Sequence, residues 1–163
     1  MTPEDLALVS ALLGRVPRGA CEVAVRTIDG SPVVIKNATH LGDGTPMPTL
    51  YWLIGERERD AVSRLEAGGG VKTAELATDP AEVAEAHARY AAERDAEAIA
   101  TDESRSPHRP TGGVGGTRQG VKCLHAHLAW YLAGGEDPVG AWTAAQLGID
   151  RARYRADELQ KRT

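Results

Sequence analysis

The residues best suited to chemistry are concentrated between Gly120 and Gly135. This segment holds Cys123, His125 and His127, which are one of the two cysteines and two of the five histidines of the chain. A thiolate and imidazoles are ligands that zinc prefers, and a thiol beside a histidine can also act as a nucleophile. The spacing therefore indicates either a metal site or a catalytic site with Cys123 and His125 as the candidate residues.

The histidine that accompanies Cys123 depends on where the helix begins. On a regular helix Cys123 and His127 lie on the same side, and His125 is about 160° away from His127. If Cys123 instead precedes the first turn, it can come close to His125. Both arrangements remain open, and the possible zinc ligands are Cys21, His40, Cys123, His125 and His127.

Two other interpretations use the same residues. A thiol at a helix N-terminus beside a lysine is activated as a nucleophile, and His125 or His127 would then serve as the base. The chain has no Cys-x-x-Cys pair. Both cysteines could therefore equally be small apolar residues of the core, with the histidines hydrogen-bonded at its margin.

A glycine-rich loop, residues 111–120, leads into this segment. Its flexible backbone amides, together with Arg118 and Lys122, suit a small anion such as phosphate at a helix N-terminus. The loop is not a Walker A motif, because Val121 separates Gly120 from Lys122 and no serine or threonine follows. We therefore expect a small anionic ligand rather than a nucleoside triphosphate.

The elements that position these residues predict an α+β fold. Alternating apolar and polar residues on either side of Asp29-Gly30 predict a β-hairpin with Cys21, Val23 and Val25 on one face, and residues 49–54 predict a third strand. Several helices should cover this small antiparallel sheet, and the one containing His125 should pack centrally. The expected helices span residues 3–14, 56–67, 79–100, 121–133 and 138–147.

Length and composition indicate a single cytoplasmic domain. A chain of 163 residues suits one domain, which we expect to span residues 1–147, with its core in 18–147 and a charged C-terminal tail in 148–163. Residues 101–116 lack periodicity and predict a mobile loop. A net charge of −4 with both signs interspersed gives no basic field to attract nucleic acid. No apolar run approaches the roughly 20 residues that cross a bilayer, so no membrane span is expected.

Three segments together resemble a known family. They run from Asp43 to Leu53, from Ala61 to Glu66, and from Gly120 to Gly135 with the Asp-Pro-Val-Gly that follows. The chain resembles the bacterial family catalogued as domain of unknown function 501, with mainly actinobacterial-type members, over most of residues 18–147. The resemblance implies no particular activity.

The resemblance also bears on the candidate site. Cys21 and the pair of Cys123 and His125 match the family pattern, whereas His127 is more variable in it, so the resemblance favours His125. Members often carry Thr-Cys-Pro after Tyr-Trp-Leu, where this chain has Ile-Gly-Glu, and a third thiolate is therefore missing here. In actinobacterial members, genes of this family tend to lie near those for a septum-formation protein, enolase and an exopolyphosphatase, and this neighbourhood implies association only.

We therefore expect a site formed by Cys21, Cys123 and His125, fronted by the loop of residues 112–122, that binds a metal ion such as zinc or a small anionic ligand. The alternative is a non-enzymatic protein-interaction module linked to cell division or envelope growth, in which the cluster only packs the core. The two differ in one observable. A site requires Cys123 and His125 to share a solvent-reachable pocket with Arg118 or Lys122.

Overall fold

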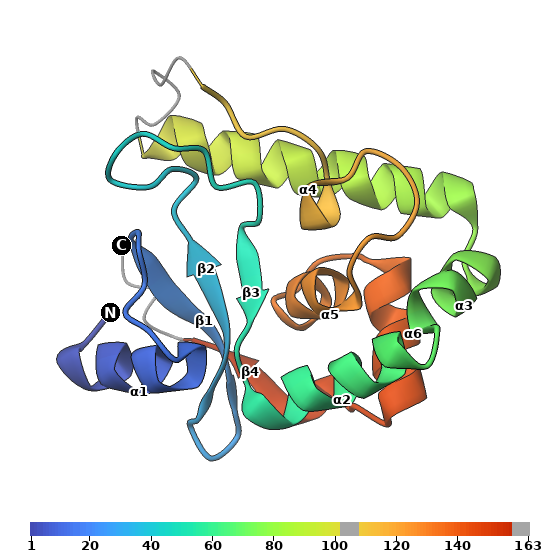
Figure 1. The fold of residues 1–163 in the computed structure, drawn as a ribbon, viewed down its shortest axis with the longest axis horizontal. Coiled ribbons are helices and arrows are strands. Elements are labelled where there is room, and N and C mark those ends of the chain that lie inside the picture. Colours follow the sequence, from blue (N-terminus) through green and yellow to red (C-terminus); the bar gives the residue numbers. More distant parts are fainter. Residues whose placement is uncertain (102–107, 158–163) are drawn as a thin grey trace.

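A four-stranded antiparallel sheet divides the helices into two layers. The computed structural model describes residues 1–101 and 108–157, and Figure 1 shows α1 on one side of the sheet and the other helices grouped around α5 on the opposite side. The predicted α+β class is confirmed. The α-helices in the described residues are α1 (Pro3–Leu13), α2 (Glu56–Ala67), α3 (Gly70–Ala77), α4 (Pro80–Ala100), α5 (Leu124–Leu132) and α6 (Pro138–Leu147).

The sheet has the strand order β3-β2-β1-β4. Strands β1 (Cys21–Thr27) and β2 (Pro32–Asn37) form the predicted hairpin, and Gly30 adopts the positive φ of 98° that its turn requires. Strand β3 (Tyr51–Leu53) pairs with β2 and is one edge of the sheet. The third strand is thus present, although it is shorter than expected.

A β-bulge changes the expected face of β1. The register between β1 and β2 shifts between Val23 and Val25. Cys21 and Val23 therefore face α1, whereas Val25 joins the main core on the other side of the sheet. The prediction that all three share one face is wrong for Val25, because strict alternation fails wherever an extra residue enters a strand.

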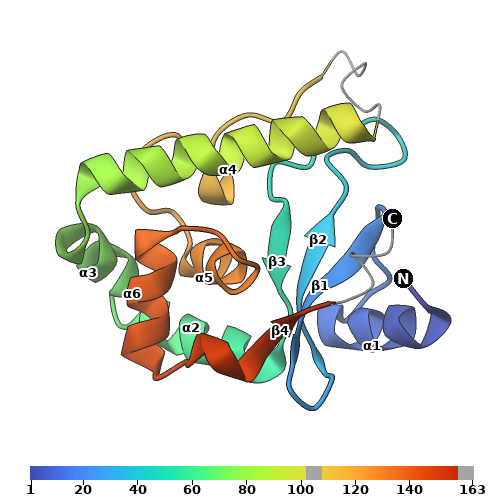
Figure 2. The ribbon, with the colours of Figure 1, turned by 180° about the vertical axis from the view of Figure 1, so that it is seen from behind.

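The fourth strand lies in the segment predicted as a charged tail. Tyr154–Ala156 form β4, which pairs with β1, and the Tyr154 hydroxyl donates a 2.8 Å hydrogen bond to the carboxylate of buried Glu58. Figure 2 shows this strand in the foreground, running from the end of α6 to β1. The sequence did not predict this strand, because its residues are too few and too polar to display a strand pattern. Residues 158–163 lie outside the described part of the chain.

The helix boundaries follow recognisable capping residues. Asp79 and Asp137 accept hydrogen bonds from the first backbone amides of α4 and α6, and a proline occupies the first position of each helix. Residues 71–76, whose sequence pattern is ambiguous, lie within α3. Of the loop predicted to be mobile, residues 102–107 lie outside the described residues, and Val114–Gly116 form a 3-10 turn.

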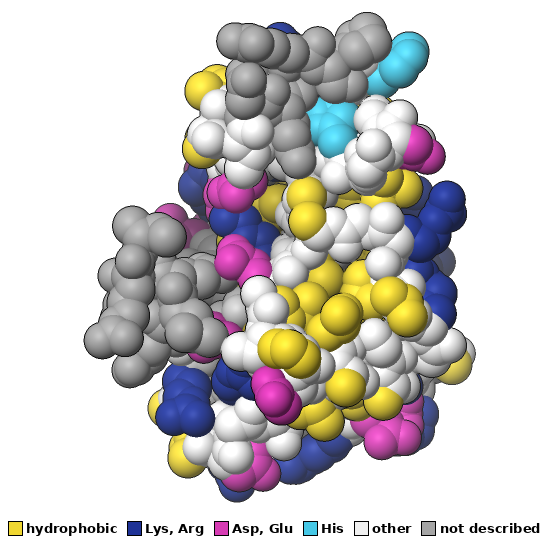
Figure 3. Space-filling model, turned by 90° about the vertical axis from the view of Figure 1, so that its left-hand side faces the viewer, with side chains coloured by type: hydrophobic (Ala, Val, Ile, Leu, Met, Phe, Trp, Pro, Cys, Tyr) yellow, Lys and Arg dark blue, Asp and Glu magenta, His cyan; other side chains and the backbone are white. Residues whose placement is uncertain are grey.

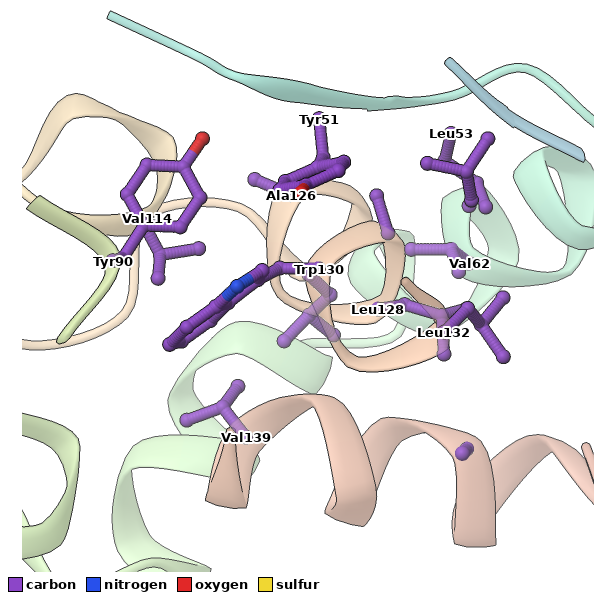
Figure 4. Packing of buried hydrophobic residues seen from close by; sticks show 14 of the residues in the cluster. Tyr51, Leu53, Val62, Tyr90, Val114, Ala126, Leu128, Trp130, Leu132 and Val139 are labelled. Atoms are coloured by element: carbon purple, nitrogen blue, oxygen red, sulfur yellow. The ribbon is translucent and has the colours of Figure 1, made fainter. Parts of the chain in front are cut away.

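Helix α5 is the centre of the main core. Seven of its nine residues are buried, so it is apolar nearly all round, as expected for a helix surrounded by others. Figure 4 shows Tyr51 and Leu53 pointing from β3 toward α5, with Val139 of α6 on the other side. Trp130 packs edge-on against Tyr90 of α4 at 5.2 Å between ring centroids. This packing fixes where α5 begins and therefore where Cys123 lies.

One arginine connects the two ends of the described chain. The Arg26 guanidinium in β1 forms ion pairs of 2.9 Å with Asp5 of α1 and 2.9 Å with Asp157, which follows β4. All three side chains are largely buried. In the described parts of the chain, no helix combines the length and apolarity needed to cross a membrane.

Candidate metal centre

Helix α5 begins one residue after Cys123. Cys123 has extended backbone angles of φ −154° and ψ 115°, and Leu124 is the first helical residue. The arrangement based on a regular helix through Cys123 is therefore wrong, and the alternative with a non-helical Cys123 is correct. Its Sγ lies 3.8 Å from Nδ1 of His125.

A glutamate from α2 completes the cluster. Glu66 Oε2 lies 3.3 Å from His125 Nδ1, and its other oxygen accepts a 2.6 Å hydrogen bond from the backbone amide of Leu124. The Cys123 side chain caps no amide of α5, so Glu66 fills that role from another helix. A carboxylate suits this position because the N-terminus of a helix carries partial positive charge.

The second nitrogen of His125 determines the orientation of its ring. Nε2 lies 3.2 Å from the backbone oxygen of Arg59 and 3.2 Å from Oγ of Ser63. A carbonyl oxygen can only accept a hydrogen bond, so Nε2 carries the proton. In the neutral ring, Nδ1 therefore presents its lone pair toward the Cys123 thiol and the Glu66 carboxylate.

The electrostatics of the cluster favour a positive charge at this nitrogen. The hydrogen bond with the Cys123 sulfur, and then the Glu66 carboxylate, raise the pKa of His125, while burial opposes them. A lone pair aimed at a carboxylate is repelled unless a proton or a metal ion lies between them. The side chains of His125 and Glu66 are about one quarter exposed, so solvent reaches both.

The separations within the cluster fit one metal ion. The candidate ligand atoms of Glu66, Cys123 and His125 all lie within 4.8 Å of one another. With zinc bond lengths of about 2.0 to 2.3 Å and tetrahedral angles, sulfur and nitrogen ligands are about 3.6 Å apart, and nitrogen and oxygen ligands about 3.4 Å. The observed 3.8 Å and 3.3 Å are close to these values.

The cluster opens into a pocket of about 430 Å³. Cys123 and His125 form part of one wall, and Arg59 and Ser63 of α2 contribute polar groups nearby. Gly115 also borders the pocket, and its missing side chain leaves space beside Cys123. The remaining lining comes from Leu13, Thr49, Tyr51, Trp52, Leu53 and Ala126.

Cys21, His127 and His40 lie elsewhere. Cys21 packs in the layer between α1 and the sheet, where burial raises the pKa of its thiol. His127 is fully buried in α5, and its Nδ1 lies 2.7 Å from Asp137. His40 is buried as well, with Nε2 donating a 2.8 Å hydrogen bond to the backbone oxygen of His108. These three predicted ligands are therefore not brought to Cys123.

The glycine-rich loop is held by a histidine of α4. His87 Nδ1 accepts a 3.1 Å hydrogen bond from the Val114 amide, and Nε2 donates a 2.8 Å bond to the Gly120 oxygen. A Cβ on Gly113 would come within 2.5 Å of the His87 side chain, so glycine is required there for close packing. His87 is buried, and burial lowers its pKa.

The predicted anion ligands do not face the cluster. Arg118 is exposed and lines a different pocket of about 500 Å³ with Arg94 and Arg109, and Lys122 is exposed beside Cys123. Cys123 and His125 do share a solvent-reachable pocket, but its cation is Arg59. Cys123 and His125 thus share a pocket, as a site requires, but neither Arg118 nor Lys122 lines it.

Sequence reasoning missed Glu66, Arg59 and Ser63. All three lie on α2, about 60 residues before the helix that they contact. One signal was available for Glu66, because it closes the second of the three segments on which the family resemblance rests. Arg59 contacts His125 through its backbone oxygen. Every residue type has this oxygen, so the contact cannot be recognised from the sequence.

Comparison with known proteins gives one match. The sequence profile of the family described as Protein of unknown function (DUF501) matches residues 23–145, which is most of the chain. The comparisons with curated proteins and with solved structures found no match. The matched region runs from within β1 to within α6 and therefore includes Glu66, Cys123 and His125.

Proposed function

Because the chain belongs to the DUF501 family, whose description names no activity, we propose a function from the geometry alone: Glu66, Cys123 and His125 bind a divalent metal ion of the zinc type. The observation that carries this proposal is the orientation of His125. Its Nε2 faces the Arg59 carbonyl, so Nδ1 points its lone pair at a thiol and a carboxylate. Metal-binding histidines typically donate their other N–H to such a carbonyl.

The ligand set suits a metal with an open coordination position. Three protein ligands leave a fourth tetrahedral position for water or substrate, as in catalytic zinc sites. Glu66 and His125 are partly exposed and the cluster borders the pocket, so a small molecule can reach this position. A bound zinc ion would act there as a Lewis acid. Arg59 is placed to hold an anionic group of a ligand in the same pocket.

A cysteine nucleophile explains the geometry less well. In a nucleophile, base and orienting acid, the histidine uses one nitrogen for the nucleophile and the other for the acid. Here the Cys123 sulfur and the Glu66 carboxylate both face Nδ1 of His125. Two groups on the same nitrogen compete as partners of a proton but act together as ligands of a metal.

The test is elemental analysis of the purified, untagged protein after incubation with zinc and gel filtration. We expect about one zinc per chain in the wild type and in Cys21→Ser, whose thiol lies on the other side of the sheet. Cys123→Ser should lose the metal while remaining folded by circular dichroism. A folded wild-type protein that retains no zinc, or equal loss in Cys21→Ser, would refute the proposal.

Cobalt substitution provides a readout of which atoms bind the metal. Cobalt bound by the Cys123 thiolate gives a sulfur-to-metal charge-transfer band that cobalt bound only by nitrogen and oxygen lacks. The band should be present in the wild type and in Cys21→Ser and absent in Cys123→Ser. Cobalt binding without this band would exclude Cys123 as a ligand.

The pocket beside Arg118 favours a second candidate function, the binding of a small anion of the phosphate type. Arg109 and Arg118 line it, together with Arg94, whose guanidinium is already paired with Asp95 and donates to the Gly112 oxygen. Titration with inorganic phosphate, followed by NMR, should shift the amides of residues 111–113. Arg118→Gln should weaken this response and Lys122→Gln should not, because Lys122 does not line the pocket. An identical response in both variants would exclude Arg118 as a phosphate ligand.

The exposed apolar residues of α1 favour the protein-interaction alternative. Leu6 is 41% exposed and Leu8 is 51% exposed, although both are large apolar side chains. Figure 3 views the molecule from the side where α1 lies and shows hydrophobic side chains gathered on this face. A protein partner would cover such a surface. Pull-down with the wild type and with Leu8→Lys distinguishes a partner that needs this face from one that does not.

A further inference from the structure

Among the described residues that line the pocket beside the proposed metal centre, Arg59 is the one with a permanent charge. Its Nη1 atom donates a 2.8 Å hydrogen bond to the backbone oxygen of Leu12, so the guanidinium is fixed against the end of α1. The side chain is 38% exposed and remains open to solvent. A guanidinium has five N–H donors, and a single bond to Leu12 leaves others for a ligand.

The charge of Arg59 is only weakly compensated. Its ion pair in the described residues is with Asp60, with 3.9 Å between Nε of Arg59 and the carboxylate. The Asp60 side chain is 53% exposed, and ion pairs of this kind at the surface contribute little. Asp60 also lies outside the lining of the pocket. The guanidinium therefore presents most of its charge to a ligand in the pocket.

The metal-loaded cluster adds no net charge to the pocket. The two positive charges of a zinc ion are balanced by the Glu66 carboxylate and the Cys123 thiolate, and a metal-bound histidine is neutral. Arg59 therefore leaves one positive charge in a pocket that also holds an open metal position. An anion with a single negative charge balances it. A dianion or a cation instead leaves an excess charge between mostly apolar walls, which is unfavourable.

The rest of the lining is mainly apolar. Leu13 from the end of α1 and Trp52 from β3 both line the pocket, and both side chains are only partly buried. The volume of about 430 Å³ lies within the range of about 300 to 1,000 Å³ that small-molecule sites occupy. Such sites hold the body of a ligand against apolar walls and orient it through a few polar groups. Here those groups are the open metal position and Arg59.

We propose that the ligand of this site is a small monocarboxylate with an apolar body, whose carboxylate pairs with the Arg59 guanidinium while a second polar atom occupies the open metal position. An arginine can give a carboxylate two parallel hydrogen bonds, which fix the orientation of the ligand as well as adding affinity. Leu13 and Trp52 contact the apolar body. This inference rests on the proposed metal function, because the second polar contact is made to the metal.

Arg59 also connects the ligand to the metal. Its backbone oxygen accepts the hydrogen bond from His125 Nε2, so one residue of α2 holds both a metal ligand and the anion. A molecule that contacts the metal and Arg59 together binds more tightly when the metal is present. Because coupling free energies are reciprocal, this molecule must raise the affinity for zinc by the same factor. A carboxylate that contacts Arg59 alone lacks this effect.

The probes are ω-mercapto carboxylates of increasing chain length and the primary amides of the same acids, added to the cobalt-loaded protein. A probe thiolate at the open position adds to the sulfur-to-metal charge-transfer band, so the spectrum reports contact with the metal. At the best chain length we expect the carboxylate to bind about tenfold more tightly than its amide, the effect of one charge-assisted hydrogen bond. Equal affinities of acid and amide at every length would overturn the inference without any change to the protein.

Two variants on α2 test the role of Arg59. Arg59→Gln removes the guanidinium but keeps the backbone oxygen that holds His125. Arg64→Gln removes an exposed cation of the same helix that lies outside the pocket lining. The preference for the carboxylate over the amide should disappear in the first variant and persist in the second, and both should bind cobalt with the thiolate band. An equal preference in the two folded variants would contradict the pairing with Arg59.

Removal of the metal separates this inference from the proposed function. Affinity for the best carboxylate should fall by about tenfold or more in the metal-free Cys123→Ser variant, which keeps Arg59. If the metal binds with its thiolate band but acid and amide bind alike, the inference fails and the metal centre stands. If the carboxylate binds equally well with and without the metal, it does not contact the metal, and the inference fails as well. A protein that binds no metal refutes the metal centre and, with it, this inference.

Discussion

Glu66 has two roles, and two different substitutions can separate them. One of its oxygens accepts the 2.6 Å hydrogen bond from the Leu124 amide, and the other faces His125 Nδ1. Leu124 is fully buried, so the removal of Glu66 leaves a backbone N–H without a partner among the described residues. We predict that Glu66→Ala and Glu66→Gln destabilise the metal-free protein to different extents.

The magnitudes follow from what each variant retains. An unsatisfied buried donor costs 1 to 3 kcal/mol or so, and the loss of an N-terminal cap costs a similar amount, so Glu66→Ala should lose about 2 kcal/mol. Glutamine keeps an acceptor for the Leu124 amide but loses the negative charge at the helix N-terminus. Glu66→Gln should therefore lose only about 0.5 kcal/mol.

The assay is equilibrium unfolding in urea with EDTA present, followed by tryptophan fluorescence. Glu85→Gln is a matched control. The Glu85 side chain is 73% exposed, and its one ion pair, 3.6 Å to Arg89, lies at the surface, where such pairs contribute little to stability. The reasoning is refuted if Glu66→Ala is no less stable than Glu66→Gln. When EDTA is replaced by zinc at 100 times its dissociation constant, the wild type should gain about 2.7 kcal/mol. Glu66→Ala should gain much less.

Three further predictions concern residues around the site. Burial lowers the pKa of His87 in the folded protein, so unfolding takes up a proton below a pH of about 6.5. The free energy of unfolding of the wild type should therefore fall, relative to that of His87→Gln, by up to about 1.4 kcal/mol per pH unit in urea titrations. A gap that is constant between pH 7 and pH 5 would contradict this sign. Gly113→Ala forces a Cβ to within 2.5 Å of His87 and should cost more than about 2 kcal/mol in thermal unfolding. Tyr154→Phe removes the hydroxyl that donates to buried Glu58 and should cost about 1 to 2 kcal/mol in the same assay, whereas an unchanged melting temperature would show that water replaces it.

The parts of the fold that depend on local sequence were predictable. The hairpin around Gly30 and the helices that begin after Asp79 and Asp137 follow from turn and capping residues, and all three are present. The bulge in β1 and the pairing of β4 depend on partner strands that the sequence pattern does not reveal. The errors therefore fall where long-range pairing overrides local preference.

The candidate site divides in the same way. Cys123 and His125 were identified from residue type and spacing, but their pairing depended on whether Cys123 lay inside the helix, as in the expected span of 121–133, or before it, as in α5 (Leu124–Leu132). Cys123 is extended and not helical, so its side chain does not lie on the same helix face as His127 and instead approaches His125. Glu66 could not be derived from spacing, because it reaches the cluster only through the packing of α2 against α5.

The ion pairs of Arg26 have a consequence for how this family changes over evolution. Arg26 lies within residues 23–145 that match the family profile, whereas Asp5 and Asp157 lie outside that region. A relative without these two acids would leave the equivalent arginine largely buried and uncompensated, which is costly. Selection should therefore retain or replace the three positions together, so that mutations near one end of the gene are accepted or rejected according to the residue encoded near the other.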